Sequence, residues 1–266
     1  MPAPSSLRLA TRGSPLARWQ ADRVAALLRR RGVEVELVVV ETQGDRRTDV
    51  PLAALGGQGV FVKEVQHAVA RGDADVAVHS AKDLPAAPEL QVPGLVLASL
   101  PERGDPRDRL VGGRLAELRT GSLVATGSAR RRAQLANRRP DLTFTDLRGN
   151  LATRLGRVGR DGVTAVVAAA AALDRLGWTP PAGMPVETFA VDDLVPQVGQ
   201  GALALECRDD DVGPTEHLGT PQGEQLGVAR AGPDQVDGHG TTTTDPGSPS
   251  EASHGPKARA PASSRR

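Results

Sequence analysis

The sequence predicts an α/β fold with two lobes, mostly parallel sheets and a central cleft. Short runs of β-branched and small apolar residues alternate along residues 7–208 with windows rich in Ala, Leu and Arg. This alternation is typical of strands joined by crossover helices. Two segments punctuated by Pro and Gly, at 101–109 and 180–196, divide the region into halves of roughly 100 residues, a normal domain size.

The expected strands are short runs in which Val, Leu, Ala and Thr dominate. They lie at 7–10, 33–40, 75–79, 95–100, 122–126, 142–147, 163–168 and 202–206. The expected helices lie between the strands and show apolar residues at helical spacing. They lie at 15–30, 60–71, 129–138, 151–160 and 169–176.

The division into lobes depends on where the last strand belongs. If the strand near 201–207 returns to the first half, the chain crosses twice between the halves and leaves a cleft between them. We therefore expect lobe 1 to comprise 1–100 and 197–211, and lobe 2 to comprise 101–196.

The composition changes after Asp211. Residues 212–266 contain 9 Gly and 7 Pro among 55 positions, together with a run of four threonines at 241–244. This reaches the ~25–30% Gly plus Pro at which low-complexity, disordered sequence is expected. We expect a disordered C-terminal tail and assign no fold to it.

Charge and cysteine content exclude several classes of protein. With 33 basic and 32 acidic residues the net charge is +1, so no bulk positive field attracts nucleic acid. A single cysteine excludes an internal disulfide, and no Cys/His cluster has the spacing of a metal site. We find no signal peptide and no run near the ~18 apolar residues of a membrane span. We expect a cytoplasmic monomer that binds no metal, nucleic acid or membrane.

Lysine is rare in this chain. Only three of the 33 basic residues are lysines, at positions 63, 82 and 257, and the abundance of Arg, Ala, Gly and Pro is typical of a GC-rich coding bias. Arginine is then weak evidence of function. A lysine supplies a compact ammonium that arginine cannot replace, so Lys63 and Lys82 are stronger candidates than any single arginine.

The strand at 75–79 is followed by Ser80-Ala-Lys-Asp-Leu-Pro85. Ligands of open α/β sheets bind outside the carboxyl ends of the strands, which is where Lys82 and Asp83 lie. Their ammonium and carboxylate can hold an anion and stabilise a cation or move a proton. The alternative is a solvated Lys-Asp turn. His79 is expected to be a packed residue at the strand end rather than a base.

A second anion site is expected where Thr126-Gly-Ser128 joins a strand to a helix. Exposed N–H groups and the helix dipole attract anions at such a helix start. Arg130 and Arg131 on the first turn oppose the dipole, which favours an anionic partner. The alternative is that Ser128 serves only as the N-cap and that the arginines are solvated.

Two further turns repeat the arrangement. Arg148 follows a strand, and Arg154 lies one turn into the next helix, behind the expected N-cap Asn150. Arg12 and Ser14 follow the first strand. The alternative for any single arginine is a solvated helix face. Together these strand ends present Arg, Lys, Ser and one Asp, which predicts a small ligand with several carboxylates.

Familiar catalytic signatures are missing. Gly56-Gly-Gln-Gly59 precedes a helix, but the Gly-x4-Gly-Lys-Ser/Thr spacing of a nucleotide-binding loop is absent. No Gly-x-Ser-x-Gly nucleophile elbow occurs. With 5 scattered His and no Tyr, a Ser-His-Asp triad has little support.

At these residues the sequence resembles the porphobilinogen deaminase family, also called hydroxymethylbilane synthase. The similar stretches occur in the family's order and spacing across 7–211. They are Ala10-Thr-Arg-Gly-Ser-Pro-Leu-Ala17, Gly59-Val-Phe-Val-Lys-Glu64, Asp75-Val-Ala-Val-His-Ser-Ala-Lys-Asp83, Asp105-Pro-Arg-Asp108, Arg138-Arg-Pro-Asp141, Leu147-Arg-Gly-Asn150 and Val198-Gly-Gln-Gly-Ala202. The resemblance implies two lobes like those of a periplasmic binding protein, which agrees with the expected cleft.

The resemblance implies a transferase of haem and tetrapyrrole biosynthesis. The family joins four porphobilinogen molecules with loss of ammonia into linear hydroxymethylbilane, on a dipyrromethane cofactor held by a cysteine thioether. It implies that Asp83 is the catalytic carboxylate. It also implies binding of substrate and cofactor carboxylates at Arg12, Ser14, Lys63, Lys82, Thr126, Ser128, Arg130, Arg131, Arg148, Arg154 and Arg175.

The sequence departs from the family in three places. Gln58 stands where Lys is common and Gly127 where Ser is common, so an anion contact is expected to be lost at each. The family's attachment cysteine lies in a third α/β domain, and nothing after Asp211 resembles that domain. Cys207 matches a different family cysteine, on a core strand, and we expect it to be structural.

We therefore expect a hydroxymethylbilane synthase-type chain in which 212–266 stands in place of the third domain. The dipyrromethane attachment cysteine is absent, so the chain as written is expected to be inactive. The alternative, from a different class, is a non-catalytic two-lobed protein that binds polycarboxylates.

Overall fold

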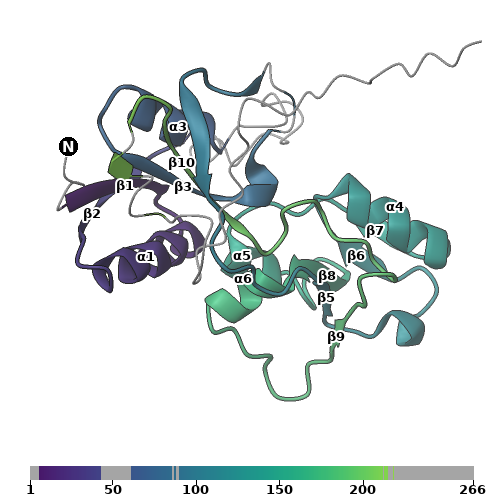
Figure 1. Ribbon diagram of the computed structural model, residues 1–266. Helices are drawn as coiled ribbons and strands as arrows, with labels where there is room; N and C mark the ends of the chain where they lie inside the picture. The colour runs from purple at the N-terminus through teal and green to yellow at the C-terminus, as the bar shows by residue number, and fades with distance from the viewer. Residues whose placement is uncertain are drawn as a thin grey trace, which may run out of the picture. The chain divides into compact units, whose positions relative to one another are not determined.

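The computed structural model of the chain describes residues 6–42, 61–85, 87, 90–211, 213–214 and 218 (Figure 1). These residues belong to a compact unit that spans 1–231. The strands are β1 (Ser6–Arg12), β2 (Glu34–Val40), β3 (Val76–Ser80), β4 (Leu95–Ser99), β5 (Asp108–Val111), β6 (Leu123–Ala125), β7 (Thr143–Thr145), β8 (Val163–Ala169), β9 (Val186–Thr188) and β10 (Leu203–Arg208). The helices are α1 (Pro15–Arg29), α3 (Lys63–Ala70), α4 (Ala129–Arg138), α5 (Leu151–Leu155) and α6 (Ala170–Arg175), with 3-10 turns η2 (Ala81–Asp83) and η4 (Leu115–Glu117).

The first sheet has the strand order β2-β1-β3-β10-β4. β1 pairs in parallel with β2 over its whole length and with β3 on its other side. β10 runs antiparallel to both β3 and β4, so four of the five strands point in one direction.

The second sheet has the order β7-β6-β8-β5-β9. β6 pairs in parallel with β7 and β8, whereas β5 runs antiparallel to β8 and β9. Here too four of the five strands point in one direction. The α/β class with two sheets of mostly parallel strands is confirmed.

Helices cover both faces of the first sheet. On one face Val24 and Leu28 of α1 share a buried cluster with Leu9 of β1. On the other face Val65 of α3 packs in a cluster with Ala10. Leu9 and Ala10 are neighbours in the chain, and they meet different helices because successive strand side chains point to opposite faces.

The second sheet is covered in the same way. Leu135 of α4 packs with Leu110 on one face. Leu155 of α5 and Leu173 of α6 pack with Val111, the next residue of β5, on the other face. Each sheet therefore forms the middle layer of three.

The ordered chain extends past the boundary expected at Asp211. The side chain of Leu218 is fully buried and belongs to the same cluster as Leu9 and Leu28. The segment expected to be a tail from 212 onward thus contributes one described side chain, Leu218, to the core of the first sheet. The rest of the tail, apart from 213–214, lies outside the described residues.

All eight expected strands and five expected helices are present, with two clear differences in length. The strand expected at 142–147 comprises only Thr143–Thr145. The helix expected at 151–160 ends at Leu155, because Gly156 caps it and the chain turns at Gly159, whose φ is +77°. β5 and β9 were not expected. β9 lies in the punctuated segment 180–196 and β5 begins at the end of the segment 101–109, and both are too short to show an apolar alternation.

The chain crosses between the sheets twice, from β4 to β5 and from β9 to β10. The crossings meet where the N–H of Gly104 donates to the carbonyl oxygen of Gly201 over 2.9 Å. The φ of Gly201 is +86°, and a Cβ there would lie 2.5 Å from the Gly104 oxygen. Only glycine fits this approach.

Gly199 is held in the same way near the end of β3. Its φ is +73°, and a Cβ would lie 3.0 Å from the backbone nitrogen of Lys82. The Nε2 group of Gln197 also donates to the Lys82 carbonyl over 2.9 Å. The second crossing therefore contacts the turn that contains Lys82 and Asp83.

Candidate functional site

The predicted site residues lie where parallel strands end. In the first sheet β1 ends at Arg12, and β3 is followed directly by the turn with Lys82 and Asp83. In the second sheet β6 is followed by Thr126, and Arg148 lies three residues beyond the end of β7. The carboxyl ends of parallel strands form one edge of a sheet, the edge where ligands of α/β proteins bind.

Electrostatic effects connect residues of the two sheets. Burial lowers the pKa of the Lys82 ammonium, and Asp83 opposes this shift. The positive charges of Arg131 and Arg154 lower the pKa of Lys82 further, and Asp108 opposes them. The second crossing links the Lys82 turn to the second sheet, because Gln197 donates to the Lys82 carbonyl and Gln200 donates to Asp108.

Several of the same charged groups affect the pKa of Arg154. Burial lowers the pKa of its guanidinium, Arg131 lowers it further, and Asp83 raises it. Arg148 and Arg12 add weaker effects that lower it. We call Arg12, Lys82, Asp83, Arg131, Arg148 and Arg154 the strand-end cluster.

Three side chains of the site cap helices. Ser14 Oγ accepts from the N–H of Ala17 over 3.3 Å at the start of α1. Ser128 Oγ accepts from the N–H of Arg131 over 3.4 Å at the start of α4. Asn150 caps α5 through its Oδ1 atom, 2.9 Å from the backbone nitrogen of Thr153. The capping alternative for Ser128 is therefore present, and ligand binding by Ser14 and Ser128 stays a prediction.

Thr126 is buried beneath the turn that leads into α4. Its Oγ1 accepts from the N–H of Ser128 over 3.2 Å, and its own N–H donates to the carbonyl of Thr145. Between them, Gly127 leaves no room for a side chain, because a Cβ would lie 2.9 Å from the Leu147 oxygen. Gln58, the other departure from the family pattern, lies outside the described residues.

Arg130 and Arg131 share a counter-ion that the sequence did not reveal. The carboxylate of Asp108 is fully buried and accepts from Arg130 Nη2 over 2.7 Å and from Arg131 Nη2 over 2.6 Å. Burial opposes ionisation of Asp108, but the attraction and hydrogen bonds of Arg131 and Arg130 outweigh it and lower its pKa. The Nε2 group of Gln200, from the second crossing, also donates to Asp108 over 2.9 Å.

The remaining guanidinium groups of the cluster are held in different ways. Arg154 Nε donates to the carbonyl of Gly149 over 2.7 Å. The guanidinium carbon of Arg12 lies 4.2 Å from the ring centroid of Phe61, a cation–π contact. These contacts fix both groups in position.

Two expected site residues lie apart from the cluster. Lys63 is exposed at the first position of α3, and no contact joins it to the cluster within the described residues. Arg175 ends α6, where its Nη2 group donates to the carbonyl of Gly201 over 2.5 Å and its guanidinium faces Trp19. The structure thus brings Arg175 to the crossings rather than to the strand ends.

Two other expectations about single residues are confirmed. His79 is packed at the end of β3, with Nε2 3.1 Å from Glu206 Oε2. Glu206 also accepts from Gln66 Nε2 over 2.9 Å. Cys207 is fully buried on β10, and burial raises the pKa of its thiol to about 11.

The described residues show neither a metal-binding cluster nor a membrane-spanning helix. Within 6–42, 61–85 and 90–211 and the few other described positions, no three His, Cys, Asp or Glu residues are grouped so that they could hold a metal ion. No helix in the described part of the chain has the length and apolar character needed to span a bilayer.

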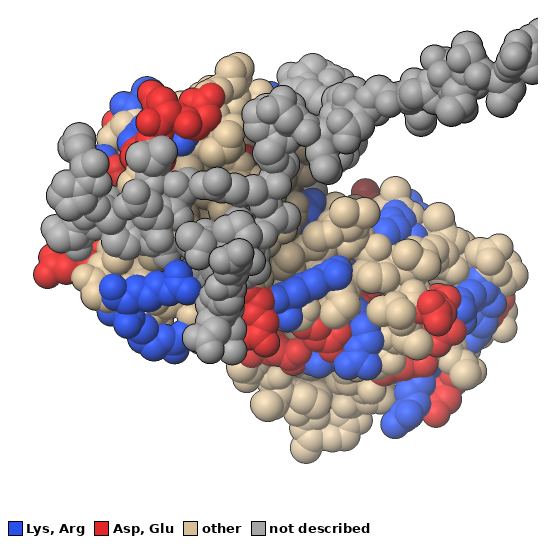
Figure 2. Space-filling view, in the orientation of Figure 1, with Lys and Arg blue, Asp and Glu red and all other residues tan. Residues whose placement is uncertain are grey.

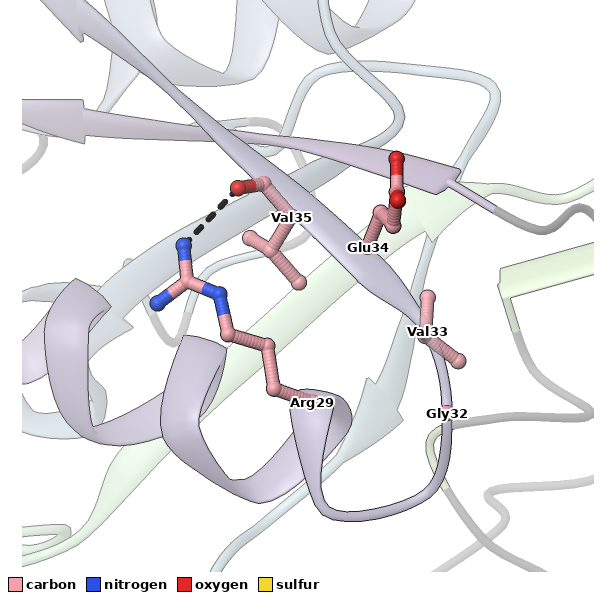
Figure 3. A pocket seen from close by; sticks show the side chains of 5 residues that line it. All are labelled: Arg29, Gly32, Val33, Glu34 and Val35. Carbon is pink, nitrogen blue, oxygen red and sulfur yellow. Dashed lines mark hydrogen bonds between the residues drawn. The ribbon is translucent and has the colours of Figure 1, made fainter.

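A shallow pocket of about 440 Å³ lies away from the strand-end cluster (Figure 3). Arg29, Gly32 and Val35 line it, and Arg29 Nη2 donates to the carbonyl of Val35 over 2.9 Å. This pocket lies at the start of β2. Because β1 and β2 are parallel, it lies at the opposite edge of the sheet from Arg12.

Comparison with known proteins agrees with these observations. Residues 7–215 match a family model described as porphobilinogen deaminase, dipyromethane cofactor binding domain. The porphobilinogen deaminase of Acidothermus cellulolyticus is 50% identical over 211 residues, which cover 78% of this chain and 62% of that protein. The porphobilinogen deaminase of Trichlorobacter lovleyi is 46% identical over 221 residues, which cover 81% and 69%.

The chain thus spans 62% and 69% of the length of these two relatives. Among solved structures, the methionine-binding protein MetQ is similar with a TM-score of 0.49 and 15% identity, covering 80% of this chain and 87% of that one.

Proposed function

The chain belongs to the porphobilinogen deaminase family, and on that premise we propose that its strand-end cluster is the substrate site of a hydroxymethylbilane synthase-type transferase and binds porphobilinogen, although this chain is expected not to turn it over. In this reaction four porphobilinogen molecules join head to tail with loss of ammonia and give linear hydroxymethylbilane. The reaction belongs to haem and tetrapyrrole biosynthesis.

The observation that supports this proposal is the carboxylate of Asp83 among the cations of the strand-end cluster, where the other nearby carboxylate, Asp108, is committed to Arg130 and Arg131. Asp83 acts on the pKa of both Lys82 and Arg154, so it lies near both. The acetate and propionate groups of porphobilinogen can pair with the guanidinium groups of Arg148 and Arg154, since arginine binds carboxylates with two parallel hydrogen bonds. Asp83 repels those groups and attracts the part of the ligand that becomes positive.

That positive charge develops on the pyrrole when the aminomethyl group leaves as ammonia. A fixed carboxylate in a partly buried site stabilises such a charge without reorganising solvent. We therefore assign the catalytic role to Asp83, and substrate carboxylate binding to the arginines around it.

The dipyrromethane cofactor of the family fits these residues only in part. The cations of the cluster suit its carboxylate side chains. Its thioether bond, however, needs a thiol, and Cys207, the single cysteine in the sequence, is fully buried in the first sheet with a raised pKa. Cys207 does not fit as the anchor. This observation favours the second candidate function, a protein that binds polycarboxylates without turnover.

Calorimetric titration with porphobilinogen tests the binding step. Arg148→Ala should weaken binding by about 1.5–3 kcal/mol, the scale of a hydrogen bond to a charged group. Asp83→Asn should bind the substrate as tightly as the wild type or more tightly, because it removes a negative charge that repels carboxylates. Arg119→Ala, an exposed arginine outside the cluster, is the matched control and should bind like the wild type.

The two variants separate the roles. Unchanged affinity in Arg148→Ala removes this arginine from the site. A loss of binding in Asp83→Asn as large as that in Arg148→Ala contradicts the assignment of Asp83 to the developing cation.

We also propose two lobes, 1–100 with 197–211 and 101–196, and a cytoplasmic location. The lobes are supported by β10, which pairs with strands of the first sheet after the chain has completed the second. The location is supported by the single, buried cysteine. Acidic and basic side chains alternate on the face seen in Figure 2, in keeping with the net charge of +1 and a ligand smaller than nucleic acid.

A further inference from the structure

A second pocket, of about 340 Å³, lies beside the two crossings. Its walls come from α1, the first crossing, α6 and the start of β10. The lining residues used below are Trp19, Arg23, Arg30, Arg103 and Arg175. α1 and α6 are in contact here, so the pocket is formed by elements that pack on both sheets.

The pocket has an excess of positive charge. Four arginines line it, together with Glu102, Asp105 and Asp174. Asp105 pairs with Arg107 over 2.8 Å, and Asp174 pairs with Arg109 over 2.6 Å. Neither Arg107 nor Arg109 lines the pocket, so two of its three acids are neutralised from outside.

The arginines of the pocket are not neutralised in this way. Within the described residues, no carboxylate lies within ion-pair distance of Arg23, Arg30, Arg103 or Arg175. Arg103 Nε donates to the carbonyl of Gln200 over 2.9 Å, and Arg175 Nη2 donates to the carbonyl of Gly201. These backbone contacts fix the guanidinium groups, and none of the described carboxylates neutralises them by an ion pair.

Trp19 gives the pocket an aromatic wall. Its ring centroid lies 5.6 Å from the guanidinium carbon of Arg175. Burial lowers the pKa of Arg175, so an anion beside it would offset a charge that water stabilises poorly. Leu27 and Leu203 add apolar surface to the lining. Fixed cations beside an aromatic and aliphatic wall are the composition of a small-molecule site.

We propose that this pocket binds a small organic anion with two or more carboxylates and a flat apolar body. The carboxylates pair with Arg23, Arg103 and Arg175, and the apolar body lies against Trp19. The site lies apart from the strand-end cluster. Arg175 is the one lining residue that the family resemblance also assigns to carboxylate binding, and the roles of Arg23, Arg103 and Trp19 do not rest on the proposed transferase function. Because two of its arginines bind the carbonyls of the second crossing, its ligand contacts the segment that joins the sheets.

Titration of the full chain with benzene-1,3,5-tricarboxylate, followed by tryptophan fluorescence, tests this proposal. The wild type should give a saturable change, because Trp19 is one of only two tryptophans in the sequence. Arg23→Gln/Arg103→Gln should weaken binding at least about tenfold, the effect expected when a charge-assisted hydrogen bond is lost. Arg119→Gln/Arg160→Gln removes the same charge from exposed positions outside the pocket and should bind like the wild type.

Arg148→Ala distinguishes this pocket from the strand-end cluster. Arg148→Ala should lose porphobilinogen affinity and keep the fluorescence response to the tricarboxylate. Arg23→Gln/Arg103→Gln should keep porphobilinogen affinity and lose the fluorescence response. The proposal is overturned if the pocket variant, shown by circular dichroism to be folded, keeps wild-type affinity. It is also overturned if the folded wild type gives no saturable change, or if Arg148→Ala abolishes the response.

Discussion

Asp108 determines how two arginines of the site lie. It is fully buried, and it receives hydrogen bonds from Arg130, Arg131 and Gln200. Burying a charge is costly, and partners on several sides offset that cost. Arg131 gives a further N–H to the carbonyl of Val167 over 3.1 Å, so its guanidinium is largely committed within the protein. Arg131 therefore shapes the site more than it offers hydrogen bonds to a ligand.

Asp108→Asn should destabilise the protein by about 3–5 kcal/mol at pH 7, because it leaves the buried Arg131 and the partly exposed Arg130 without their counter-ion. Urea unfolding monitored by circular dichroism measures this. Asp141→Asn is the control. Asp141 pairs with Arg139 over 2.7 Å at the surface, and its replacement should have a much smaller effect.

The difference in stability between the wild type and Asp108→Asn should depend on pH. Folding lowers the pKa of Asp108 below its ordinary value of 3.8. The stabilisation is therefore complete above that value and is lost as the pH falls through the folded pKa. The gap in unfolding free energy between wild type and Asp108→Asn should narrow below pH 3.8. A gap that stays constant from pH 7 to pH 3 contradicts an ionised Asp108.

Single residues could be predicted where a strand end reveals them. The positions of Asp83 and Arg148 just after strands, and of Arg154 within a short helix, could be predicted from local sequence, and their roles stay predictions. Asp108 could not be found in this way, because its partners Arg131 and Gln200 lie 23 and 92 residues away in the sequence. The fold alone brings them together.

The two crossings are the elements on which the placement of the sheets depends. Their contact needs Gly201 in a left-handed conformation. A Cβ atom on residue 201 would lie 2.5 Å from the Gly104 oxygen. Gly199 makes a similar approach to the turn of Lys82. The Val198-Gly-Gln-Gly-Ala202 stretch thus has a backbone role, and Gln200 between the glycines reaches Asp108.

Gly201→Ala should cost more than the ~1–2 kcal/mol of an alanine in the left-handed region, since its Cβ also clashes with the first crossing. Gly121→Ala isolates the conformational part. Its φ is +77°, and nothing lies within 4 Å of the added carbon. Urea unfolding of both variants measures the difference. Equal losses in the two proteins would show that the crossings move apart without cost.

Elements with a clear apolar pattern were predicted from the sequence, and the others were not. β8 has a nearly continuous buried run and was expected to within one residue at its end. β5 was missed because its first two residues, Asp108 and Arg109, are charged and satisfied by ion pairs with distant helices. A propensity scale assigns such residues to loops, and tertiary pairing overrides it.

At the scale of the whole molecule, the location of Cys207 limits the chemistry. The thiol lies on β10 in the middle of the first sheet and has a pKa raised to about 11, so little thiolate is present at neutral pH. Its neighbours Leu205 and Leu203 belong to the same buried cluster. A pyrrole attached at this sulfur would have to displace that core.

The purified 266-residue chain should therefore have the bare polypeptide mass of 27.7 kDa and give no colour with a pyrrole reagent. Intact-mass spectrometry and an Ehrlich test measure the two properties. A folded apoprotein that binds porphobilinogen but makes no hydroxymethylbilane is the expected result. A covalent adduct on Cys207 together with product formation would contradict it.

The antiparallel position of β10 also constrains the order in which the chain folds during translation. Among the described strands, β4 pairs with β10 alone, and β10 is the last strand to leave the ribosome. All strands of the second sheet, within 108–188, are synthesised before it. The first sheet, whose strands β1 to β4 are synthesised first, is thus completed last. Until residue 203 emerges, the nascent chain has open edges on β3 and β4, where a chaperone or a second nascent chain can bind.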